Sequence, residues 1–120
     1  MELDHAKLLR RIQGVARLSS PVRAVVRYLA TDPGFVRAVA PESDAVKIDE
    51  QFVWPIVVQS LCVLRSGMAW PPEPVTAATI DGLTGVPSFA VALAHANLVA
   101  TEGGMYDLIP LEPALPAVKS

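Results

Sequence analysis

Residues 75–111 read VTAATIDGLTGVPSFAVALAHANLVATEGGMYDLIPL, and they contain the most informative pattern of helix and turn signals in the chain. Thr76 suits the N-cap position of a short helix, because its hydroxyl can accept a hydrogen bond from a free amide in the first turn. That helix carries the apolar residues Ala77, Ile80 and Leu83. Residues 84–87, TGVP, end it, since glycine permits a left-handed turn and proline cannot continue the helix before it.

A second helix is predicted over residues 88–99. We expect its inward residues to be Val91, Ala94 and Leu98, together with Phe89 or His95. The next residues, EGGM, are typical of a tight hairpin, because Gly103 and Gly104 accept positive φ at both central positions. The predicted strands of this hairpin are residues 100–101 and 106–109.

Helix, tight turn, helix and hairpin is the element order of a winged helix-turn-helix. In this order, in the TGVP turn and in the Gly103-Gly104 hairpin, residues 75–111 resemble the winged helix-turn-helix superfamily of bacterial transcription regulators. The resemblance covers about a third of the chain. It implies that the second helix would enter the DNA major groove. Asp81 stands where the superfamily usually has a small apolar residue.

The face that the resemblance assigns to DNA contains no lysine or arginine. On the second helix it offers Ser88, Ala92, Asn97 and one of His95 and Ala96, and on the hairpin Thr101, Glu102 and Asp107. DNA affinity comes largely from cations that neutralise phosphates. This composition favours a protein partner over DNA, and it leaves Ser88 and Asn97 as the residues that a nucleic acid could meet there.

Three helices are predicted before this unit. Residues 3–18 have an apolar stripe made of Leu8, Leu9, Ile12, Val15 and Ala16. Ser20 and Pro21 begin a second helix, which turns Val22, Val25, Val26 and Leu29 inward. Asp32 and Pro33 begin a third, which carries Phe35, Val36 and Val39 and ends at Pro41.

The middle of the chain is ambiguous at one place. Residues 42–51 are polar and indicate a loop. The segment 46–54 could be a strand or a helix, and Val46, Ile48, Phe52 and Trp54 share one parity, as they would in a strand. Pro55 suits the first turn of a helix that runs from about residue 53 to about Arg65. The following prolines separate a helical N-terminal layer, residues 1–70, from the unit at residues 75–111.

We therefore predict a mainly α fold: a single-domain helical bundle that ends in a winged helix-turn-helix-like unit with a small β-hairpin. Residues 112–120 form a proline-containing tail. Pro110, Pro113 and Pro116 repeat with the period of a polyproline II helix, so the tail is either an extended arm or a disordered end.

Composition excludes several classes of protein. Hydrophobic residues make up 52% of the 120 residues and charged residues 18%, which excludes a disordered chain and predicts an exposed apolar patch. The single cysteine, Cys62, excludes a disulfide framework and favours a reducing, cytoplasmic compartment. Residues 82–101 carry no formal charge, but their polar groups indicate a buried helix rather than a membrane span. We expect no cofactor and no metal.

Charge is distributed unevenly along the chain. Residues 1–40 hold seven basic residues against three acids, whereas residues 41–120 hold three against nine. Arg10, Arg17, Arg23 and Arg27 could line a phosphate-binding stripe on the N-terminal helices. The alternative is a solvated helical face, or one that docks on the acidic half of the same or a neighbouring chain.

A protein partner would meet exposed apolar side chains. The predicted contact residues are Phe89, Leu93, Trp70 and Tyr106, each with half-buried or core packing as the alternative. Leu93 falls where the superfamily often presents a polar side chain to DNA. The sequence therefore predicts a non-enzymatic regulator or adaptor in transcription control that binds a protein or itself, as a homodimer. The alternative is a dimeric DNA-binding regulator whose N-terminal arginines contact phosphates.

Overall fold

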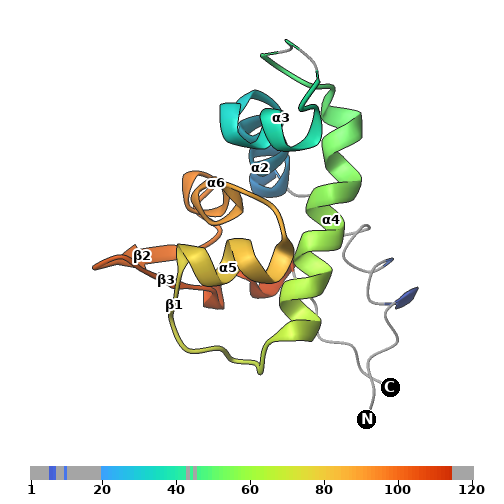
Figure 1. The fold of residues 1–120 in the computed structure, drawn as a ribbon. Coiled ribbons are helices and arrows are strands. Elements are labelled where there is room, and N and C mark those ends of the chain that lie inside the picture. Colours follow the sequence, from blue (N-terminus) through green and yellow to red (C-terminus); the bar gives the residue numbers. More distant parts are fainter. Residues whose placement is uncertain (1–5, 8–9, 11–19, 43, 45, 115–120) are drawn as a thin grey trace.

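The computed structural model describes residues 6–7, 10, 20–42, 44 and 46–114, most of which are helical (Figure 1). The helices are α2 (Ser20–Thr31), α3 (Pro33–Val39), α4 (Glu50–Gly67), α5 (Ala77–Thr84) and α6 (Phe89–His95). The strands are β1 (Val75–Thr76), β2 (Ala100–Glu102) and β3 (Met105–Asp107), and a 3-10 helix, η1, covers Ile109–Ala114. The predicted fold class, mainly helical with a small β-hairpin, is confirmed.

The helices before residue 40 begin where proline was expected to start them. α2 begins at Ser20, and its buried residues include the three valines and the leucine predicted to face inward. In α3, Asp32 is the N-cap, and its Oδ2 accepts a hydrogen bond of 3.0 Å from the Phe35 amide. The predicted helix at residues 3–18 lies largely outside the described residues. Three of its members, Ala6, Lys7 and Arg10, are helical and exposed.

Helix α4 begins at Glu50, three residues before the predicted start near residue 53. Asp49 caps it, because its Oδ1 accepts a hydrogen bond of 2.9 Å from the Gln51 amide. Pro55 therefore lies inside the helix, where it withholds one amide from the carbonyl of exposed Gln51. Residues 46–48 form neither strand nor helix, so the alternation of apolar residues there does not mark a strand.

The three strands form one antiparallel sheet in the order β1-β3-β2. The hairpin of β2 and β3 is confirmed, and Gly103 and Gly104 have φ values of 58° and 82°. Strand β1 was not predicted, because two residues are too few to show a period. It pairs with β3 and places a strand between α4 and α5 along the chain.

The core lies among α2, α4, α5 and α6, each of which contributes buried side chains. Helix α6 lies between α2 and α5 and packs against both (Figure 1). The largest fully buried side chains are Phe35, Phe89, Leu29, Leu61, Leu64, Ile80, Leu93, Leu108 and Leu111. In the described part of the chain, no single helix has the length and apolar character needed to cross a membrane. Helices α5 and α6 reach that length and apolar composition only when they are counted as one segment, and they are bent by 116° at their junction.

The start of the predicted polyproline II arm is wrong. Residues 109–114 form the 3-10 helix η1, and Leu111 is buried in the core. Both conformations have three residues per turn, so a proline at every third position fits either one. Residues 115–120 lie outside the described part of the chain.

Candidate partner interface

Helices α5 and α6 meet at 116° across a break of four residues. The turn begins at Gly85, which has a φ of 68° and ends α5. Asp81 of α5 then caps α6, because its Oδ1 accepts a hydrogen bond of 2.9 Å from the Ala90 amide. Ser88, the N-cap by position, is left-handed at φ 66° and makes no side-chain cap bond. The acid at position 81 is therefore a brace between the two helices.

The end of α6 is set by Asn97, which has a φ of 59°. The Leu98 amide donates to the Leu93 carbonyl at 2.9 Å, and the Asn97 amide donates to the Ala94 carbonyl at 3.0 Å. This is the Schellman pattern, in which asparagine can replace the usual glycine. The helix consequently ends at His95, not near residue 99 as predicted. Asn97, predicted as a possible nucleic-acid contact, is exposed, and its left-handed conformation ends the helix.

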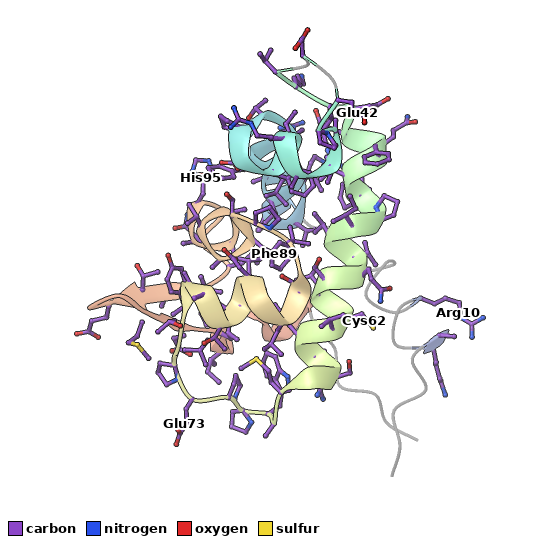
Figure 2. All side chains as sticks on the ribbon, in the orientation of Figure 1. Arg10, Glu42, Cys62, Glu73, Phe89 and His95 are labelled. Atoms are coloured by element: carbon purple, nitrogen blue, oxygen red, sulfur yellow. The ribbon has the colours of Figure 1, made fainter. Side chains whose placement is uncertain are left out.

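The predicted exposure of α6 is wrong at its two main residues. Phe89 and Leu93, expected at a partner surface, are fully buried, and Figure 2 shows Phe89 between α5 and α6. Val91, expected in the core, is 44% exposed. The sequence predicts one inward stripe on this helix. Because α2 covers one side and α5 another, the buried arc is wider and its centre is shifted.

Only a narrow outward stripe of α6 remains, which we call the α6 stripe and which consists of Val91 and His95. Figure 2 shows His95 on the outer side of the helix. Its ring lies 4.9 Å from the ring of Tyr28 in α2, centroid to centroid. Neither residue of the stripe is a lysine or an arginine, and the chain contains neither type between Arg65 and Lys119.

Trp70 and Tyr106 are half-buried and have structural contacts of their own. The indole Nε1 of Trp70 donates to the Leu64 carbonyl at 3.3 Å, and the Arg65 guanidinium lies 5.5 Å from the indole centroid. Tyr106 sits opposite Val75 and packs against the core. Both side chains pack against the core, and core packing accounts for both.

The predicted phosphate-binding arginines that the structure describes do not belong to the α6 stripe, because they lie outside α6. Arg23 and Arg27 are exposed one turn apart on α2. The Arg27 guanidinium also approaches Glu50 of α4, with Nε and Oε1 3.7 Å apart. Arg10 is exposed, and Arg17 lies outside the described residues.

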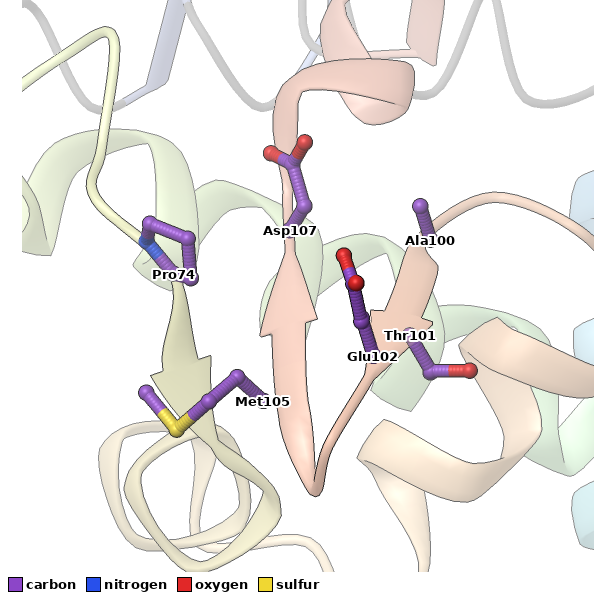
Figure 3. A pocket seen from close by; sticks show the side chains of 6 residues that line it. All are labelled: Pro74, Ala100, Thr101, Glu102, Met105 and Asp107. Atoms are coloured by element: carbon purple, nitrogen blue, oxygen red, sulfur yellow. The ribbon is translucent and has the colours of Figure 1, made fainter.

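A shallow hollow of about 380 Å³ lies on the sheet (Figure 3). Its lining residues are Pro74, Ala100, Thr101, Glu102, Met105 and Asp107. The register places Ala100 opposite Asp107 and Glu102 opposite Met105, so these four side chains share the outer face of the sheet. The hollow therefore has two carboxylates, an exposed methionine and no cation. The sequence did not predict this hollow. Pro74 reaches it only because the next two residues form β1, which pairs with β3, and β1 was not predicted.

The described ranges contain no metal-binding cluster, and their one cysteine is buried. Among these residues, no three His, Cys, Asp or Glu side chains are placed to hold a metal ion. Cys62 is buried in α4, and its burial raises the pKa of the thiol above the ordinary value of 9.0. A thiol in this environment is held in its protonated, weakly nucleophilic form.

Comparisons with known proteins add no relative. No protein-family model matches the chain, and neither the curated proteins nor the solved structures give a match.

Proposed function

We propose that this chain is a non-enzymatic regulator or adaptor with a winged-helix scaffold that binds protein rather than DNA. The element order from α4 onward is helix, strand, helix, helix and two strands, with a sheet ordered β1-β3-β2. The turn at Gly85, the angle of 116° and the two-glycine hairpin support the winged helix-turn-helix assignment. In this assignment α6 is the second helix of the motif and β2-β3 is the wing.

The observation that carries the protein-binding function is the surface of α6. A DNA-reading helix needs a broad polar face, whereas α6 is seven residues long and exposes mainly Val91 and His95. Helix α2 covers the side opposite α5. The adjacent wing contributes Glu102 and Asp107, which phosphates would repel.

A duplex-binding experiment tests this function. Fluorescence anisotropy with labelled duplexes of mixed sequence should give no saturable binding at about 50 mM salt, where phosphate contacts are strongest. Saturable binding that weakens steeply with salt would contradict the proposal. In a pull-down, Val91→Arg should reduce capture of the protein partner, while Ala78→Arg, a control on the exposed face of α5, should not.

A second function, direct DNA binding by the arginines of α2, rests on the exposure of Arg23 and Arg27. Replacing both with alanine would then weaken binding to all duplexes about equally, because phosphate contacts carry no sequence information.

We also propose that the chain associates with itself as a dimer, and sedimentation equilibrium measures this directly.

A further inference from the structure

We propose that the edge of β2 binds an extended protein segment in which basic residues alternate with β-branched apolar ones. This inference rests on the proposed protein-binding function and names the chemistry of the partner. Its basis is the sheet order, in which β3 is central and β1 and β2 are the two edges. Within the described part of the chain, no strand pairs with the outer side of β2.

The hairpin register fixes which backbone groups are open at that edge. Glu102 and Met105 flank the two-residue turn, so they form the hydrogen-bonded pair next to it. The pairs alternate along the hairpin, which makes Thr101 and Tyr106 a pair without mutual hydrogen bonds. The N–H and C=O of Thr101 therefore point away from β3, toward the open edge, as an incoming strand requires.

The side chains beside this edge select the residue types of the incoming strand. An added strand would place alternate side chains on the outer face of the sheet, next to Ala100 and Glu102. That face holds the hollow, whose carboxylates come from Glu102 and Asp107 and whose apolar surface comes from Met105 (Figure 3). A lysine or arginine fits this position by charge. The other alternate side chains would lie beside Thr101, where β-branched residues pair well.

The probe is a capped seven-residue peptide of alternating valine and lysine, added to the full chain and followed by amide NMR. The Thr101 amide should shift and become protected from hydrogen exchange. The same peptide with glutamate in place of lysine should bind at least tenfold more weakly, and Glu102→Lys should weaken binding of the lysine peptide to a similar extent. Glu102 is exposed, so this change leaves the core intact.

Thr101→Pro removes the open amide and should abolish binding, whereas Thr101→Val keeps the amide and should not. Proline is tolerated where a strand amide faces solvent. If the proline variant fails to fold, a lysine peptide with methylated backbone amides replaces it as the test and should not bind.

The inference would be overturned by no binding of the lysine peptide, by equal binding of both peptides, or by binding that survives Thr101→Pro. Self-association of the free chain that is lost in Thr101→Pro would also overturn it, because the occupant would then be a second copy. Capture of a partner through Val91 with no effect at the β2 edge would refute this inference and leave the proposed function standing.

Discussion

Two substitutions in α6, Leu93→Ala and Val91→Ala, test which side of the helix is buried. The structure buries Leu93 and exposes Val91, whereas the sequence predicted the reverse. Leu93 is fully buried between the neighbouring helices, and Val91 is 44% exposed. Leucine-to-alanine changes at fully buried sites cost about 3–5 kcal/mol, through lost transfer free energy and the cavity left behind. The change at Val91 should cost less than about 0.5 kcal/mol, because exposed substitutions cost little and alanine favours the helix.

For a domain of this size, a loss of about 3 kcal/mol should lower the midpoint of thermal unfolding by about 10–20 °C. Circular dichroism at 222 nm against temperature and against urea measures both variants. A shift in the urea midpoint at constant slope would identify a change in stability alone. The reverse order, with Val91→Ala strongly destabilising and Leu93→Ala neutral, would mean that α6 is rotated and would refute the placement of its outward stripe.

Three further predictions concern the turn, the wing and the thiol. Asp81→Ala should lower the free energy of unfolding by about 1–2 kcal/mol, because α6 loses its cap. Asp81→Asn should lower it by less, since the amide oxygen of asparagine can still accept the hydrogen bond. Equal losses for the two variants in urea melts would contradict the capping role of Asp81. Gly104→Ala should cost about 1 kcal/mol because its φ is 82°, and an unchanged urea midpoint would exclude that conformation. The Cys62 thiol should react with a disulfide reagent far more slowly in the native chain than in urea, because it is buried. The free energy of unfolding should fall as pH rises above about 9, where the thiol ionises in the unfolded chain but not in the folded one. Rapid labelling of the native chain would contradict the burial of Cys62.

Local signals in the sequence were sufficient for most of the fold. Proline and aspartate marked the starts of α2 and α3, and the glycine pair marked the hairpin, because these residues act through their own backbone conformation or nearest amides. The start of α4 was misplaced because Pro55 is a strong helix-start residue. The Asp49 cap lies six residues earlier in a polar loop and outweighs it.

The exposure of residues on α6 could not be predicted as well, because it depends on contacts between elements distant in sequence. Phe89 and Leu93 were placed outside and Val91 inside, since the sequence does not reveal that α2 packs on a second side of α6. The hollow on the sheet also needs β1, which is too short to detect from sequence. Asp81 was noticed as a departure from the superfamily, but its role required the position of the Ala90 amide.

Amide NMR of the chain titrated with a mixed-sequence 20-base-pair duplex is the decisive test of the proposal that α6 and the acidic hairpin form a surface for protein rather than for DNA. We expect the amides of Val91, His95 and Thr101 to stay at their positions throughout the titration. Saturable shifts of these amides, reversed by added salt, would contradict it.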